Sequence, residues 1–86
     1  MLQISFTPKF QRMLKKLEPA LRDEVRENIA LLENPANHQH LRVHKLQGRF
    51  GSVFSFSVNY RTRVIFEYEN ESSVILEAVG SHDIYR

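Results

Sequence analysis

The chain contains no cysteine among its 86 residues, which excludes a disulfide and any metal site built on thiolates. It has no run of about 18 apolar residues, so it offers no transmembrane helix. Internal repeats and low-complexity stretches are also missing. The start, Met1 to Phe6, is too short for a signal peptide and lacks its basic leader. We therefore expect a single domain, residues 1–86, in the cytoplasm and without membrane contact.

Acidic residues are missing from the middle of the chain. None of the ten Asp and Glu residues falls between Asn34 and Phe66, and this segment carries a charge of +5 within a net charge of +2. A patch of one sign attracts polyanions, and this one is typical of a protein that binds nucleic acid. Its basic and histidine residues are Arg42, Lys45, Arg49, Arg61, Arg63, His38, His40 and His44.

The N-terminal part of the sequence predicts one strand and two helices. Residues 2–6 alternate between apolar and polar, which is typical of a half-buried strand. Thr7-Pro8 suits a helix start, and apolar residues then recur at helical spacing over 8–17 and 19–33. Two helices joined through a single proline predict an antiparallel hairpin.

The rest of the sequence predicts a sheet. Residues 41–46 alternate and predict a short strand or an extended edge, followed by a glycine-marked turn. Short connections between the later strands imply antiparallel neighbours. The fold class is therefore α+β, with a two-helix hairpin on one face of an antiparallel sheet of about four strands. The later strands are expected over residues 53–58, 63–68 and 73–79.

The sheet face away from the helices is expected to be polar, basic and free to hold a ligand. It would carry Ser55, Ser57 and Arg63. Arg61 and Arg63 occupy alternate positions, so both could face one phosphate group. The alternative is a pair of surface arginines that bind Glu67 or Glu69.

Histidines suggest two further sites. His38, His40 and His44 could hold zinc, but a closed site needs four ligands and no fourth is nearby, so we expect no metal. At the C-terminus, His82 is suited to proton transfer and Tyr85 to stacking on a base. The alternative for this segment is a frayed, solvated tail.

Three segments together resemble the RelE/ParE superfamily of bacterial type II toxins. They are Val43-His44-Lys45-Leu46-Gln47-Gly48, the run from Phe56 to Phe66, and Gly80-Ser81-His82-Asp83-Ile84-Tyr85. The N-terminal strand and helices agree with it, so the resemblance covers the whole chain. It is strongest to the RelE/YafQ-like branch of messenger-RNA interferases.

The resemblance implies a RelE-like fold and a metal-independent endoribonuclease that acts on messenger RNA at the ribosome and needs no cofactor. It assigns His44, Arg63, His82 and Tyr85 to the catalytic site. Lys45, Arg49, Arg61 and Arg42 would then bind RNA. A cognate antitoxin protein is the expected partner, in a heterotetramer or with the toxin as a homodimer.

Two departures from the YafQ-like pattern keep other functions open. Ser57 stands where that branch has a histidine, and Arg61 where it has an acid. A ParE-like protein would poison DNA gyrase without nuclease activity, although it would have no need of His44 and His82. The third possibility is an inactive RelE-like binding module.

Overall fold

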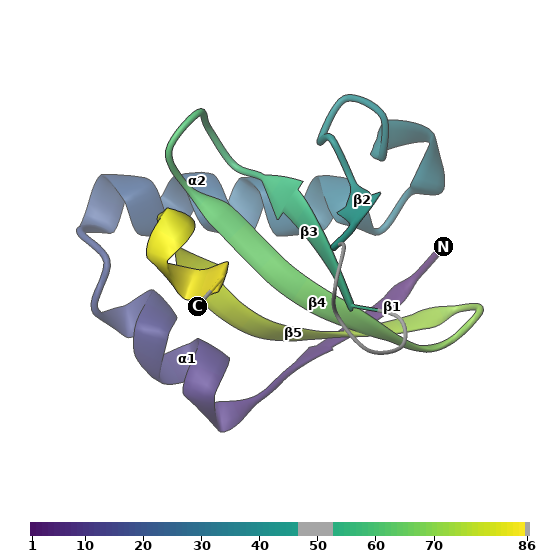
Figure 1. The fold of residues 1–86 in the computed structure, drawn as a ribbon, viewed down its shortest axis with the longest axis horizontal. Helices are drawn as coiled ribbons and strands as arrows, with labels where there is room; N and C mark the ends of the chain where they lie inside the picture. Colours follow the sequence, from purple (N-terminus) through teal and green to yellow (C-terminus); the bar gives the residue numbers. More distant parts are fainter. Residues whose placement is uncertain (47–52, 86) are drawn as a thin grey trace.

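The structure is a computed structural model that describes residues 1–46 and 53–85, with the backbone alone for His82 and Tyr85. The α+β class is confirmed, and each predicted helix and strand is present (Figure 1). No helix in these described ranges is both long and apolar enough to cross a membrane. The elements are β1 (Gln3–Phe6), α1 (Pro8–Lys15), α2 (Pro19–Leu32), η1 (Pro35–Asn37), β2 (His44–Lys45), β3 (Val53–Ser57), β4 (Arg63–Asn70), β5 (Ser73–Gly80) and η2 (His82–Tyr85).

The described residues form one five-stranded sheet in the order β1-β5-β4-β3-β2. Strands β2 to β5 pair antiparallel as predicted, but β1 pairs parallel to β5. The prediction of about four antiparallel strands therefore holds for β2 to β5, and the structure adds β1 as a fifth strand that runs parallel to β5. Short turns fix the direction of β3, β4 and β5, whereas β1 reaches β5 through the helices and most of the chain. A connection of that length leaves the strand direction open.

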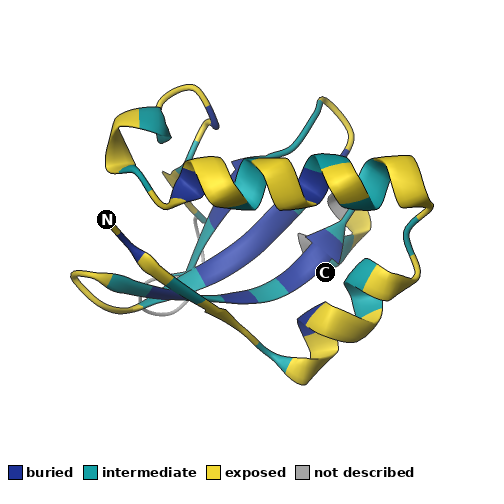
Figure 2. Cartoon of the chain, turned by 180° about the vertical axis from the view of Figure 1, so that it is seen from behind, coloured by how far each residue is buried: buried dark blue, intermediate teal, exposed yellow. Residues whose placement is uncertain are grey.

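The helices cover one face of the sheet, and the core lies between them (Figure 2). Helix α1 begins where predicted, because the Thr7 Oγ1 accepts a hydrogen bond of 3.0 Å from the Phe10 N–H and Pro8 occupies the first turn. Phe10, Val25 and Leu32 are fully buried against the strands. They pack with a group of buried strand residues, which are Phe56, Val64, Phe66, Val74 and Leu76.

A β-bulge in β5 changes which residues face the helices. Ile65 pairs with Ala78 and Phe66 with Leu76, so Glu77 is the extra residue. Regular alternation along the strand would place Ala78 on the helix side with Leu76. Instead Val79 belongs to the core cluster, while Ala78 pairs with Ile65 on the other face. A single inserted residue moves each side chain that follows it in the strand to the opposite face of the sheet.

The sheet face turned away from α2, called here the second face, is only partly open. Ser55 is fully buried, and Ile65 and Ala78 are less than a tenth exposed. The expectation that Ser55 lies on a free polar face is therefore wrong. The chain turns back after β5, and η2 lies on the opposite side of the sheet from α2 (Figure 1). Ser57 and Arg63, at the end of this face, remain half-exposed.

Candidate nucleic-acid interface

Strand pairing places two of the predicted catalytic residues on the second face. Ser57, Arg63 and Gly80 form one row across β3, β4 and β5. His44 pairs with Ser55, which belongs to the next row. Paired residues share a face, so His44 and Arg63 lie on the same side of the sheet. Strand spacing puts their Cα atoms on the order of 12 Å apart, within the combined reach of the two side chains.

Arg63 is held by the backbone of the turn that precedes its own strand. Its Nη1 donates to the Asn59 carbonyl at 2.6 Å and to the Thr62 carbonyl at 3.2 Å. Pairing with Glu67 or Glu69 is not seen, and in the described part of the chain the one recorded ion pair is Arg26 with Asp23. The donors on Nε and Nη2 are not used by these carbonyls, so the guanidinium keeps groups that suit a phosphate.

His44 is exposed, and its ring is oriented by a backbone carbonyl. Its Nδ1 lies 2.9 Å from the carbonyl oxygen of Arg42. A carbonyl can only accept, so Nδ1 carries the hydrogen and the neutral ring presents Nε2 as an acceptor. Arg42 has a φ of 59°, in the left-handed region, and is the one non-glycine residue among those described with positive φ. This unusual backbone sets the carbonyl that orients His44.

A hollow of about 330 Å³, called here the basic hollow, lies between the end of β3 and the segment before β2. Arg42 and Arg63 both line it, as does His40, and none of its lining residues is acidic. The structure therefore brings two of the predicted cationic residues together. The remaining lining residues are Asn28, Leu41, Ser57, Val58, Asn59 and Tyr60.

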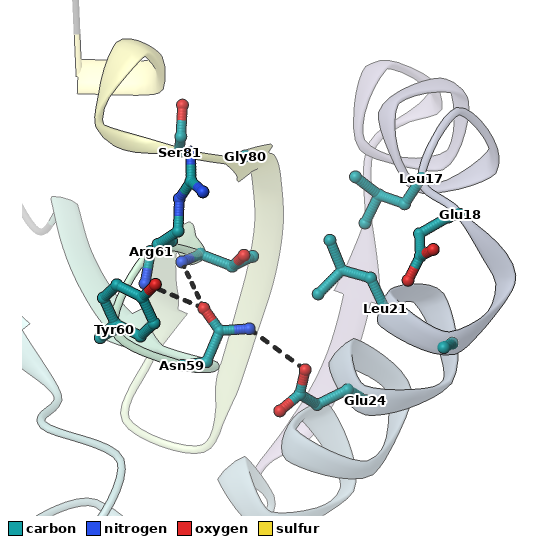
Figure 3. Close-up of a pocket in the computed structure, with 11 residues that line it drawn as sticks. Leu17, Glu18, Leu21, Glu24, Asn59, Tyr60, Arg61, Gly80 and Ser81 are labelled. Carbon is teal, nitrogen blue, oxygen red and sulfur yellow. Dashed lines mark hydrogen bonds between the residues drawn. The ribbon is translucent and has the colours of Figure 1, made fainter.

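Arg61 is separated from Arg63. It lines a second hollow of about 550 Å³, called here the elbow hollow, between the α1–α2 junction and the β3–β4 turn (Figure 3). The prediction that Arg61 and Arg63 share one face is wrong, because Arg61 belongs to the turn and strand alternation begins only with β4. In the elbow hollow, Arg61 shares the lining with Glu18 and Glu24.

The other predicted residues are distributed differently. Lys45 pairs with Phe54, whose ring stacks on Phe66 in the core, so Lys45 lies on the helix side of the sheet, away from His44. Arg49 lies outside the described residues. The three histidines do not converge: His38 donates from Nε2 to the Leu32 carbonyl at 2.9 Å, His40 lines the basic hollow and His44 binds the Arg42 carbonyl. No metal-binding group of three was found among the described residues.

The C-terminal segment forms a 3₁₀ turn, η2, at the end of the Arg63 row. It leaves from β5, which lies between β1 and β4 and is therefore not an edge strand. The backbone places His82 two residues after Gly80, the row partner of Arg63. Gly80 permits the close return: a Cβ there would lie 2.6 Å from Ile84 Cγ2. The roles of the His82 and Tyr85 side chains stay predictions.

Three features of this region were missed from the sequence. Asn59 organises the β3–β4 turn, and Tyr60 at its tip is 84% exposed. Asn is a common turn-forming residue, so the role of Asn59 could have been found from the sequence.

Glu67 and Glu77 form a carboxyl pair beyond the acid-free segment. The hydrogen bond with Glu67, then burial, then the Glu67 charge raise the pKa of Glu77 to about 7, while Lys9 opposes the shift.

Comparison by sequence gives no match to a protein-family model or to a curated protein. Comparison by structure shows that the chain has the RelE-like fold, as predicted. It is similar to YafQ from E. coli strain BL21(DE3), with a TM-score of 0.78 and 13% identity over 99% of this chain and 98% of that one.

Two solved toxin complexes share the fold. The archaeal RelE–RelB complex from Pyrococcus horikoshii OT3 matches with a TM-score of 0.73 and 17% identity over 93% of each chain. The intact E. coli RelBE toxin–antitoxin complex matches with a TM-score of 0.73 and 14% identity, over 94% of this chain and 96% of that one.

Proposed function

We propose that this chain is the toxin of a bacterial type II toxin–antitoxin system and cleaves messenger RNA on the ribosome. The observation that carries the proposal is the placement of His44 and Arg63 on one sheet face, in a fold shared with RelE and YafQ. The fold alone is compatible with several functions. A proton acceptor and a guanidinium on the same face of the sheet are groups that cleavage of RNA uses and that simple binding does not need.

The proposed reaction uses the nucleophile that RNA supplies. His44 accepts the 2′-hydroxyl proton on Nε2, and the 2′-oxygen attacks the adjacent phosphorus. Arg63 stabilises the additional negative charge of the phosphorane. The bond from phosphorus to the 5′-oxygen then breaks, and His82 donates a proton to that oxygen. The products are a 2′,3′-cyclic phosphate and a 5′-hydroxyl, and no metal or cofactor enters a step.

The assignment of base and acid follows from the hydrogen bond of His44. Because Nδ1 is committed to the Arg42 carbonyl, neutral His44 is ready to accept a proton on Nε2. We therefore assign the base to His44 and the acid to His82. Tyr85 is proposed to orient a nucleotide, and Arg42, Lys45, Arg49 and Arg61 to attract the RNA backbone.

We further propose an acidic antitoxin as the protein partner. An apolar hollow of about 320 Å³ lies between β1 and the two helices, with Phe6, Phe10 and Leu14 in its lining and Lys15 and Arg26 as its charged members. Phe6 is 48% exposed there. An amphipathic segment with apolar and acidic side chains is complementary to this surface. The neighbours in RelE–RelB and RelBE complexes support such a partner.

The test is expression of the chain alone, with mapping of message 5′ ends, beside His82→Ala and His44→Ala variants. We expect translation arrest with new 5′-hydroxyl ends from the parent, and a loss of at least about 100-fold in cleavage from either variant. Intact messages with a DNA-damage response would assign the chain to gyrase poisons instead. A His82→Ala variant as toxic and as active as the parent would remove His82 from the mechanism.

A further inference from the structure

The tip of the β3–β4 turn is a ridge with an exposed aromatic residue at its crest. Tyr60 is 84% exposed, more than any other large hydrophobic residue described. It lines both the basic hollow and the elbow hollow. An exposed aromatic ring between two hollows presents a face on which a nucleic-acid base can stack.

The backbone beneath Tyr60 is firmly held. Asn59 Oδ1 accepts from the backbone N–H groups of Arg61 at 2.9 Å and Thr62 at 2.8 Å. The Val58 N–H donates to the Thr62 carbonyl at 2.9 Å, and Arg63 ties the Asn59 and Thr62 carbonyls together. Asn59 Nδ2 also donates to Glu24 of α2 at 3.1 Å (Figure 3). A ligand that stacks on Tyr60 therefore meets a platform that is already ordered.

The two hollows beside the ridge differ in charge. The lining of the basic hollow includes Arg42, Arg63 and His40 without an acid. The lining of the elbow hollow includes Glu18 and Glu24 against Arg61 alone. A phosphate is attracted more strongly to the first hollow, because in the second hollow the two carboxylates oppose the attraction of Arg61. The basic hollow, at about 330 Å³, is at the small end of the range of roughly 300–1,000 Å³ that ligand sites occupy.

We propose that the ridge and the basic hollow form a nucleotide subsite for single-stranded RNA, in which a base stacks on Tyr60 and the adjoining phosphate binds Arg42 and Arg63. This proposal rests on the proposed function, because it adds a contact beside the reacting phosphate. Stacking on aromatic rings and cation–phosphate contacts are the usual means of binding single strands. Arg63 belongs to both sites, so the bound nucleotide would adjoin the one that reacts.

Binding is measured with a labelled 2′-O-methyl oligoribonucleotide, which has no free 2′-hydroxyl and cannot be cleaved, and with an abasic oligonucleotide of the same length. Tyr60→Ala should weaken binding to the base-bearing strand about tenfold and leave binding to the abasic strand unchanged. Tyr60→Phe, which keeps the ring, should bind like the parent. Arg42→Gln should weaken binding to both strands. It should also reduce the slope of log K against log salt concentration by about one.

A direct spectroscopic readout is also available. The chain has no tryptophan, so Tyr60→Trp places a single indole on the ridge. Its fluorescence should be quenched by the base-bearing strand and much less by the abasic one, as stacking requires. Thermal unfolding of each Tyr60 variant should match the parent, since Tyr60 is exposed and its replacement leaves the turn hydrogen bonds in place.

Each result separates the subsite from the proposed function. Equal binding of the base-bearing strand by Tyr60→Ala and the parent would overturn the subsite, even if the parent cuts messages. The expected binding pattern without any message cleavage would support the subsite and refute the endoribonuclease. Weaker binding of the antitoxin by Tyr60→Ala, with RNA binding unchanged, would assign the ridge to a protein partner and also overturn the subsite.

Discussion

The backbone conformation of Arg42 determines the tautomer of His44. A left-handed conformation costs a non-glycine residue roughly 1 kcal/mol. Here it directs the Arg42 carbonyl to His44 Nδ1 at 2.9 Å. Strain of this kind is often retained where it prepares a reactive group. The tautomer of His44 therefore depends on a backbone atom and not on another titratable side chain.

This arrangement predicts the tautomer directly. Neutral His44 should be protonated on Nδ1 and bare on Nε2, because only an N–H can face the carbonyl. Long-range ¹⁵N–¹H NMR of the ring nitrogens distinguishes the two forms. Arg42→Gly, which adopts positive φ without strain, should keep this tautomer and gain up to about 1 kcal/mol of stability. A ring protonated on Nε2 in the parent would contradict the assignment of His44 as the base.

At the scale of elements, the β3–β4 turn is joined to α2 through Asn59. This side chain satisfies two backbone N–H groups of the turn and donates to Glu24. The link joins elements far apart in the sequence, because Asn59 and Glu24 are 35 positions apart. Loss of the side chain would leave the turn without its partners and detach it from the helix.

Asn59→Ala should lower the free energy of unfolding by about 1–3 kcal/mol, as expected for part-buried hydrogen-bonding groups that lose their partner. Asn70→Ala is the matched control. Asn70 Oδ1 accepts from Ser72 in the β4–β5 turn, but that turn is exposed and the recorded bonds of Asn70 reach no helix. Urea unfolding of both variants measures the difference. Equal losses would show that the contact with Glu24 contributes nothing.

Gly80 controls how closely η2 returns to the sheet. An added Cβ would lie 2.6 Å from Ile84 Cγ2, so Gly80→Ala must displace that side chain or the turn that bears it. Because η2 carries His82, we expect a loss of cleavage of roughly tenfold or more, with a change in stability below about 2 kcal/mol. Message cleavage and thermal unfolding measure the two effects. Ser81→Ala, at the next, exposed position, is the control and should leave both unchanged.

Elements with a clear local pattern were predictable from the sequence, and contacts between distant elements were not. The spacing of apolar residues predicts the helices and the strands, and a proline marks the start of each helix. The parallel pairing of β1 and the bulge at Glu77 depend on residues far away in the chain, which local alternation does not report. For the same reason the sequence identified Arg42 and Arg63 as cations. It did not show that they share a hollow from which Arg61 is excluded.

On the scale of the whole molecule, charge is separated along the second face of the sheet. The end with Ser57 and Arg63 adjoins the basic hollow, whereas Glu67, further along β4, is joined to Glu77. The acid-free segment ends at Phe66, so this boundary in the sequence is also a boundary on the surface. An anionic strand bound at the basic end would be repelled where the carboxyl pair begins.

The carboxyl pair makes stability depend on pH in a direction opposite to that of most acids. The Glu67 hydrogen bond, burial and the Glu67 charge raise the pKa of Glu77 from 4.5 to about 7 in the folded chain. Between these values the folded state binds more protons than the unfolded state, so stability falls as pH rises through this window. The contribution is fully present below pH 4.5 and lost above about pH 7.

Glu77→Gln should remove this dependence, because the amide stays neutral at every pH. Above pH 7 the variant should be more stable than the parent by up to about 1 kcal/mol, a bound that allows for solvent screening of a partly exposed group. Below pH 4.5 the two should converge. Urea unfolding from pH 4 to 8 measures both curves, and Glu69→Gln, at an exposed position of β4, controls for the loss of one charge. Parallel curves for parent and Glu77→Gln would show that the pair does not hold a proton near neutral pH.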